Sequence, residues 1–170
     1  MTTDHEDGRS RWGRGTLAGL LYATGALAYT LDRVTKVLAE RHLEGRPAID
    51  VIRGVLRLRF TTNPGGAFGL FGGLGWLFVT ASVVVIVVIL FASRRLPSGP
   101  SAVALGLVLG GALGNLTDRM IRGPGFSGEV VDFLDLRIWP VFNVADSCIV
   151  IGAVMLLILG LRPSRTDGTE

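Results

Sequence analysis

The feature that most constrains this chain is residues 74–93 (LGWLFVTASVVVIVVILFAS), a run of 20 residues without a charged side chain. A helix needs about 20 apolar residues to cross the hydrocarbon core of a membrane. The run is long enough to cross alone, and it therefore predicts a membrane-spanning helix.

Three further apolar segments lie at residues 16–31, 101–117 and 144–161. Each reaches spanning length only if polar side chains lie at its ends. Those end positions are occupied by Asp32, Asn115, Asp118 and Asp146. The expected fold is a mostly α, polytopic membrane protein with four transmembrane helices.

The composition favours the same class of protein. Apolar residues make up 49% of the chain and charged residues 18%, with a mean hydropathy of +0.50, whereas soluble domains contain about 25% charged residues. The single cysteine excludes an internal disulfide framework and a site built from several cysteines. The cations are scattered and not interleaved with aromatic residues, so nucleic-acid binding is not expected.

The first apolar segment has two interpretations. Arginines precede it, and Ala26-Leu27-Ala28 fits the cleavage pattern of a secretory signal peptide. Three more apolar segments behind it favour a retained signal-anchor helix. We expect one membrane domain at residues 16–162, between disordered cytoplasmic tails at residues 1–15 and 163–170.

The orientation is predicted from the short turn at residues 93–100. It contains Arg94 and Arg95 and no acidic residue, and short loops rich in such cations stay in the cytoplasm. Both termini are then cytoplasmic, and residues 33–73 and 118–143 lie on the outer face.

The first outer segment predicts a hairpin. Residues 55–60 (VLRLRF) alternate apolar and basic side chains with the period of a strand, and residues 49–54 (IDVIRG) are also strand-like. A glycine before Val55 suits a bend. We therefore expect a small amphipathic sheet that rests on the membrane surface.

Polar residues gather where the apolar segments end. Asn115, Asp118 and Arg119 have the spacing of one helix face, and Asn143 and Asp146 repeat the i, i+3 spacing. Three more polar residues stand at corresponding ends: Asp32, Lys36 and Asn63. With four antiparallel helices, all of these groups meet at the outer face, where they could share one pocket.

Several of these residues also fit purely structural roles. Asp32 with Lys36, and Asp118 with Arg119, fit ion pairs at the membrane interface. Asn115 and Asn143 fit helix caps or hydrogen bonds between helices. Gly106, Gly110 and Gly114 predict close helix packing, and Cys148 fits a small buried apolar residue.

Asp132 and Asp146 are harder to explain structurally. Neither has a basic residue within four positions, and an unpaired carboxylate at membrane depth suggests function. Two carboxylates in a poorly solvated site cannot both ionise easily, so one keeps its proton. Aspartic proteases use such a dyad, in which one carboxylate activates water and the other donates to the carbonyl oxygen. Ion translocation and metal binding remain open at this point.

The alternatives differ in the residues they need. A proton- or ion-coupled transporter would use Asp32, Asp118 and Asp146 as carriers. A metal-dependent lipid-modifying enzyme would hold a divalent ion with Asp118, Asp132, Asp135 and Asp146. Nucleophilic catalysis is disfavoured, because no motif links His5 or His42 to a serine or to Cys148.

Five motifs then occur in order: DRVTK (32–36), TNPGGAFG (62–69), GGALGNLTDR (110–119), VVDF (130–133) and FNVAD (142–146). Together they resemble the lipoprotein signal peptidases (signal peptidase II), polytopic aspartyl proteases of the bacterial cytoplasmic membrane. The resemblance covers residues 31–151, and five motifs in register are a specific signal.

The resemblance implies an endopeptidase that removes the signal peptide of a prolipoprotein, cutting before a cysteine that carries diacylglycerol. It implies a catalytic dyad of Asp132 and Asp146. Substrate-binding or dyad-orienting roles are implied for Asn63, Asn115, Arg119 and Asn143, and structural roles for Asp32, Lys36 and Asp118. It also implies a site near the extracytoplasmic face and no metal or cofactor. We further expect contact with membrane lipids and activity as a monomer.

Three departures from the family pattern stand out. Arg33 occupies a position where glutamine is frequent, the second motif reads NPGGAFG where an alanine-rich version is common, and only 13 residues separate Asp132 from Asp146. None changes either aspartate, so they bear on substrate preference and not on activity. The role of Arg33 is open.

Overall fold

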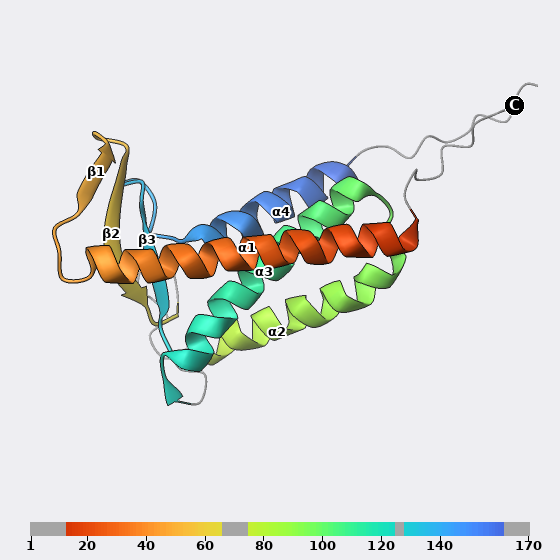
Figure 1. Cartoon of the computed structure of the whole chain (residues 1–170), viewed down its shortest axis with the longest axis horizontal. Coiled ribbons are helices and arrows are strands. Elements are labelled where there is room, and N and C mark those ends of the chain that lie inside the picture. The colour runs from red at the N-terminus through yellow and green to blue at the C-terminus, as the bar shows by residue number, and fades with distance from the viewer. Residues whose placement is uncertain (1–12, 66–74, 125–127, 162–170) are drawn as a thin grey trace, which may run out of the picture.

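The computed structural model describes residues 13–65, 75–124 and 128–161. In these residues four helices lie side by side, and a small sheet stands across one end of the bundle (Figure 1). The helices are α1 (Arg14–Leu43), α2 (Gly75–Ala92), α3 (Gly99–Ile121) and α4 (Val144–Gly160), with a single 3₁₀ turn at Ser93–Arg95 after α2. The predicted disordered tails fall mostly on residues 1–12 and 162–170, which lie outside the described residues.

Helix α3 is the centre of the bundle and packs against the other three helices. It begins after Ser98, whose side chain accepts a hydrogen bond from the N–H of Ser101, a standard N-cap. Its glycines let α1 come close: a Cβ atom on Gly106 would lie 2.6 Å from the carbonyl oxygen of Leu21. The prediction of close packing along this glycine row is confirmed.

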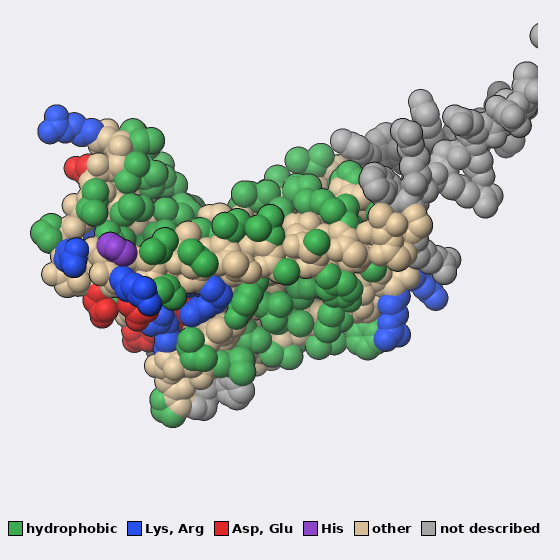
Figure 2. Space-filling view, in the orientation of Figure 1, with side chains coloured by type: hydrophobic (Ala, Val, Ile, Leu, Met, Phe, Trp, Pro, Cys, Tyr) green, Lys and Arg blue, Asp and Glu red, His purple; other side chains and the backbone are tan. Residues whose placement is uncertain are grey.

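Many apolar side chains lie on the face of the bundle seen in Figure 2. Along α2 only Gly75 and Ile89 are buried, and large valine, leucine and phenylalanine side chains are exposed. Two described helices are long and apolar enough to cross a membrane, those at Gly75–Arg95 and Gly99–Ile121, and α4 is a shorter apolar helix. Charged side chains gather near the sheet (Figure 2).

Two helix boundaries differ from those predicted. The first helix does not end at Asp32 but continues to Leu43, because Asp32 is paired inside the protein and does not need to reach water. The third helix is longer than the predicted 17 residues, since the polar residues from Asn115 to Arg119 lie on its last turns.

The sheet has three antiparallel strands in the order β1 (Ile49–Ile52), β2 (Leu56–Asn63) and β3 (Val130–Asp135). The predicted hairpin is confirmed: β1 pairs with β2, and Gly54 at the bend has φ 82°, a conformation that glycine adopts without strain. Strand β3 was not predicted.

Two apolar clusters form the core, one within the bundle and one between the bundle and the sheet. One lies between α1, α2 and α3 and includes Leu21, Ile89 and Leu109. The other joins the end of α1 to the sheet through Leu43 and Phe133. Because α1 contributes to both clusters, the sheet is attached to the helices, and β3 is held beside the start of α4.

Candidate active site

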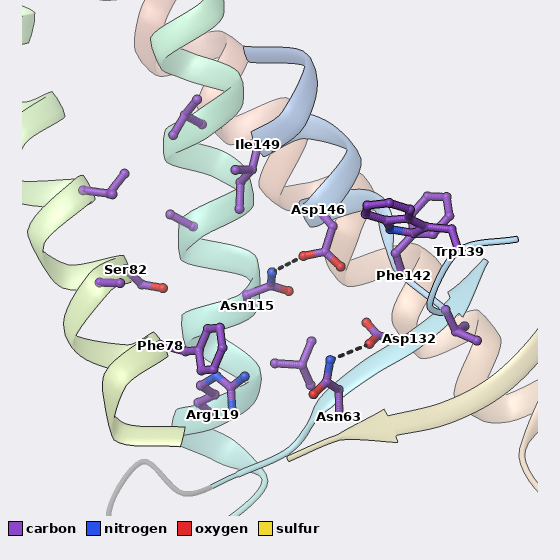
Figure 3. A pocket seen from close by; sticks show the side chains of 16 residues that line it. Asn63, Phe78, Ser82, Asn115, Arg119, Asp132, Trp139, Phe142, Asp146 and Ile149 are labelled. Carbon is purple, nitrogen blue, oxygen red and sulfur yellow. Dashed lines mark hydrogen bonds between the residues drawn. The ribbon is translucent and has the colours of Figure 1, made fainter. Parts of the chain in front are cut away.

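A cavity of about 400 Å³ opens where the sheet meets the bundle. Its apolar wall comes mainly from α2, α3, α4 and the segment between β3 and α4, and Figure 3 shows the side chains around it. The described polar side chains that line it are Asn63, Ser82, Asn115, Arg119, Asp132 and Asp146. Five of these six were candidate site residues in the sequence.

Asp132 projects into the cavity from β3 and is only 2% exposed. The side-chain NH2 group of Asn143 donates to one of its oxygens at 2.6 Å. The NH2 group of Asn63, at the end of β2, donates to the other at 3.2 Å. Both oxygens of this carboxyl group are therefore held by asparagine amides from neighbouring elements.

Burial raises the pKa of Asp132 from 3.8 to about 7. Loss of solvation is the main cause, and the nearby carboxylate of Asp146 raises the value further. The hydrogen bonds from Asn63 and Asn143 oppose the shift without cancelling it. Asp132 is thus a carboxyl group that can hold or release a proton near neutral pH.

Asp146 reaches the same cavity from the first turn of α4. Asn143 is the N-cap of this helix, and it forms a capping box with Asp146 in which each side chain accepts from the other's backbone N–H. The NH2 group of Asn115 donates to the remaining oxygen of Asp146 at 2.8 Å. The cap and Asn115 together fix the direction of this carboxylate.

Asn143 connects the two aspartates. It is fully buried, caps the helix that carries Asp146, and donates to Asp132. Its NH2 group also lies 3.2 Å from the side-chain oxygen of Asn115. The structural interpretation of Asn143 as a helix cap is therefore confirmed, and the same side chain contacts the candidate dyad.

A short hairpin brings the two aspartates together. After β3 the chain turns back, and Phe142 pairs with Leu134 through two backbone hydrogen bonds of 2.8 and 3.0 Å. Asp132 lies two residues before this bridge and Asp146 four residues after it. The compact connection noted in the sequence is therefore a closed hairpin.

Asp32, Lys36 and Asp118 do not line the cavity but form a buried cluster behind it. The ammonium group of Lys36 lies 2.9 Å from Asp32, 3.0 Å from Asp118 and 3.0 Å from the side-chain oxygen of Asn115. The predicted pairing of Asp32 with Lys36 is confirmed. Because an ammonium group only donates, Lys36 turns the NH2 group of Asn115 toward Asp146.

The two aspartates of this cluster also hold the backbone next to the candidate dyad. Asp32 accepts a hydrogen bond from the N–H of Ala145, the residue before Asp146, at 3.0 Å. Asp118 accepts one from the N–H of Val131, the residue before Asp132, at 3.3 Å. Lys36 joins the two anchors, so one buried ion cluster sets the positions of both cavity carboxyls.

The predicted ion pair between Asp118 and Arg119 is wrong. Asp118 pairs instead with Lys36, Arg33 and Arg122, because residues adjacent on a helix point about 100° apart. Arg33, whose role the sequence left open, thus supplies one cation of the buried cluster.

Arg119 lies on the cavity side of α3 and is nearly buried. It donates to the backbone oxygen of Gly128 at 3.3 Å, and its guanidinium lies 5.4 Å from the centre of the Phe78 ring. These contacts hold the guanidinium beside Phe78 on the wall of the cavity that the two carboxyl groups also line (Figure 3).

The metal alternative required four aspartates in one place, and the structure separates them. Asp132 and Asp146 line the cavity, whereas Asp118 belongs to the buried ion cluster and Asp135 pairs with Arg57 and Arg59. Among the described residues no group of three or more histidine, cysteine or acidic side chains is arranged to hold a metal ion.

Several cavity residues were missed in the sequence. Phe78, Trp139, Phe142 and Ile149 come from α2, the segment before α4, and α4 itself. Apolar and aromatic residues are common throughout this chain, so nothing in their local pattern distinguished them from lipid-facing side chains.

The sequence pattern of the family described as signal peptidase (SPase) II matches residues 24–162. This chain belongs to the signal peptidase II family. The transporter alternative is thereby wrong, and the expected family is confirmed. Signal peptidase II enzymes are peptidases of the aspartic class.

Similar proteins support the same assignment. Relatives named lipoprotein signal peptidase include one from Streptomyces griseus subsp. griseus, 47% identical over 88% of this chain and 76% of the relative. One from Rhodococcus jostii is 45% identical over 89% of this chain and 77% of the relative. One from Desulfitobacterium hafniense is 41% identical over 87% of this chain and 97% of the relative.

Two solved structures, both described as bacterial membrane enzymes, share the fold. One has a TM-score of 0.75 and 26% identity, covering 89% of this chain and 93% of the other. The second has a TM-score of 0.74 and 28% identity, covering 86% of this chain and 95% of the other. The signal peptidase II chain therefore has the fold of these two enzymes.

Proposed function

We propose that this signal peptidase II acts on prolipoproteins through an aspartyl dyad made of Asp132 and Asp146. Removal of signal peptides from prolipoproteins follows from membership of the family. The observation that carries the dyad is that both carboxyl groups line one cavity, with Asn143 bonded to each of them.

The two carboxyl groups have different roles in peptide hydrolysis. Asp132, the more buried of the two, holds the shared proton and donates it to the carbonyl oxygen of the scissile bond. Asp146 takes a proton from the attacking water. As the tetrahedral intermediate collapses, Asp146 gives the proton from water to the leaving amine, and Asp132 regains its proton from a hydroxyl group of the intermediate. A pKa of about 7 for Asp132 suits the acid role near neutral pH.

The surrounding side chains orient the dyad and the peptide. Asn63, Asn115 and Asn143 hold the carboxyl groups. Arg119 places a positive charge where the carbonyl oxygen develops negative charge. Asp32, Lys36 and Asp118 have a structural role through the backbone anchors at Val131 and Ala145.

The proposed substrate is a prolipoprotein with a diacylglyceryl group on the cysteine after the cut. Such a substrate is a membrane-embedded peptide with acyl chains, so its scissile bond lies at the membrane surface. The cavity fits this location, because its wall is mainly apolar while its polar groups gather at the sheet end.

We further propose that all four helices cross the cytoplasmic membrane. The start of α1 and the end of α4 lie together, opposite the sheet (Figure 1), which suits two cytoplasmic termini. Arg94 and Arg95 follow α2 at the same end. The sheet and the dyad then face the extracytoplasmic side, in contact with membrane lipids, and one copy of the chain forms the site.

The test is cleavage of a purified diacylated precursor by wild-type enzyme and by Asp132→Asn and Asp146→Asn. Each substitution should abolish cleavage while the protein remains folded, because the amide can neither donate a carboxyl proton nor accept one from water. Glu129→Gln, at an exposed position, is the matched control and should retain activity. Substantial cleavage by either aspartate variant would show that the dyad is wrongly assigned.

The proposed reaction uses no metal ion or organic cofactor. Activity should therefore persist after treatment with a chelator and dialysis. Loss of cleavage on chelation, followed by recovery on adding a divalent metal, would contradict the proposal.

A further inference from the structure

The segment between β3 and α4 carries the most exposed side chains near the cavity. Ile138 is 91% exposed and Trp139 is 67% exposed, yet Trp139 lines the cavity together with Val141 and Phe142. Figure 3 shows Trp139 beside Phe142 and close to Asp146, on the side of the cavity away from α2. A large apolar surface therefore stands open next to one carboxyl group of the proposed dyad.

The backbone that presents this tryptophan is in an unusual conformation. Arg137 has φ 64°, and it is the one non-glycine residue with positive φ in the described part of the chain. Such a conformation is unfavourable for a residue with a side chain and persists only where its surroundings impose it. Here the turn is what sends residues 138–142 back over β3, toward the cavity.

Ionic and hydrogen-bond contacts impose the turn. Asp135 is almost fully buried and accepts the backbone N–H of Arg137 at 2.8 Å. Its side chain is held in turn by Arg57 at 2.7 Å and Arg59 at 3.3 Å, both on β2. The guanidinium of Arg137 also pairs with Asp50 on β1 at 2.8 Å. The turn is thus fixed to all three strands.

We propose that Trp139 is a specificity-determining residue that contacts an apolar group of the substrate next to the scissile bond, and that Asp135 is the positioning residue that holds it there. Phe142 lines the same cavity, and its own backbone is fixed by its pairing with Leu134. The inference rests on the proposed function, because it assumes a peptide bound between the dyad and this loop.

The apolar group could be an acyl chain on the cysteine or a side chain of the signal peptide. The experiment compares Trp139→Ala with wild type on three precursors: one with long acyl chains, one with short acyl chains, and one with alanine in place of the apolar residues before the cut. We expect KM on the long-chain precursor to rise about tenfold and kcat to stay within about twofold.

The precursor series identifies the group. If Trp139 contacts the acyl chain, the rise in KM should disappear on the short-chain precursor. If Trp139 contacts the signal peptide, the rise in KM should disappear on the alanine precursor. Trp76→Ala is the matched control, because Trp76 is 62% exposed on α2 but does not line the cavity. An unchanged KM for Trp139→Ala on all three precursors would overturn the proposal.

Asp135→Asn tests the positioning role. It should raise KM in the wild-type background but add nothing in the Trp139→Ala background, because its effect passes through the tryptophan. An equal rise in both backgrounds would show that Asp135 acts only on overall structure. Asp132→Asn is run alongside: cleavage by that variant overturns the dyad and leaves the KM comparison of Trp139 intact.

Discussion

Asp132 is a carboxyl group whose charge is poorly solvated in the folded protein, and this has a consequence for stability. Its pKa is about 7 when folded and 3.8 for the free side chain. A raised carboxyl pKa means that the folded state binds the proton more tightly than the unfolded state. The contribution of Asp132 to stability is therefore largest below about pH 4 and is lost as the pH rises to about 7.

Asp132→Asn should consequently become more stable relative to wild type as the pH rises. Asparagine does not titrate, so the difference in free energy of unfolding should grow between about pH 4 and pH 7, by up to about 1.4 kcal/mol per pH unit. Thermal unfolding of both proteins in detergent across this range measures it.

Asp135→Asn provides the control for that titration. Burial alone would raise the pKa of Asp135, but the N–H of Arg137 and the guanidinium of Arg57 outweigh it and hold the pKa below 3.8. Because its pKa is lowered and not raised, this residue does not bind a proton more tightly on folding between pH 4 and pH 7. Its variant should show no such trend, and a flat difference for Asp132→Asn would contradict the assigned pKa.

A second prediction concerns Asn143, which is both the cap of α4 and a donor to Asp132. Asn143→Ala should lower stability by about 1 kcal/mol through the lost cap and lower kcat by roughly 100-fold through the lost donor. Asn143→Ser restores a capping oxygen but cannot donate to Asp132 in the same way. Thermal unfolding should therefore show that Asn143→Ser recovers the stability lost in Asn143→Ala. Cleavage assays should show that its kcat stays low.

Among the elements, the contact between α1 and α3 controls the site. Gly114 of α3 faces the Asp32 carboxylate, and Asp32 anchors Ala145 at the start of α4. A Cβ atom at position 114 would overlap Asp32 and lie 3.4 Å from the Cβ of Ala145. One methyl group would therefore disturb three helices at once.

Gly114→Ala should reduce both stability and cleavage, because Asp32 must shift to make room. Gly19→Ala is the matched control: no atom lies within 4 Å of a Cβ there, and alanine is the better helix former. Its stability should be equal to wild type or slightly higher. Full activity of Gly114→Ala would contradict the role of the Asp32 anchor. Cleavage rates and unfolding midpoints provide the measurement.

Sequence predicts these elements well where their surroundings leave a pattern. Strand β2 was recognised at residues 55–60 because apolar and basic residues alternate there; Leu58 and Phe60 pack against the apolar cluster, whereas Arg59 is exposed. Strand β3 is buried on nearly every residue, which leaves no alternation to detect. The extension of α1 beyond Asp32 was missed because its charges suggest an exposed end, whereas Lys36 neutralises them inside the protein.

Some residues of the candidate site could likewise be predicted from the sequence, and others could not. Asp132 and Asp146 could be predicted because each lacks a basic neighbour in sequence and lies in a family motif. The pairing of Asp118 with Arg33 could not, since Arg33 is 85 positions away and reaches it only through helix packing. The proposed role of Trp139 depends on a backbone turn at Arg137, and the local sequence pattern does not predict this turn.

On the scale of the whole molecule, the start of α1 and the end of α4 lie at the end of the bundle opposite the sheet (Figure 1). A reporter fused after Arg95 should report the cytoplasm, since the positively charged turn between α2 and α3 is retained there. A reporter inserted at Gly54, on the β1–β2 bend, should report the outer side. An external signal after Arg95 would invert the proposed orientation.

The bridge between Leu134 and Phe142 has a consequence for when the enzyme can act. Asp132 is fixed by the sheet, but Asp146 belongs to the last helix and joins it only once α4 is seated on α3 and Asp32 has captured Ala145. Under the proposed mechanism, a chain in which α4 is not yet in place therefore lacks one of its two carboxyl groups. The proposed dyad is completed by the last of the described helices.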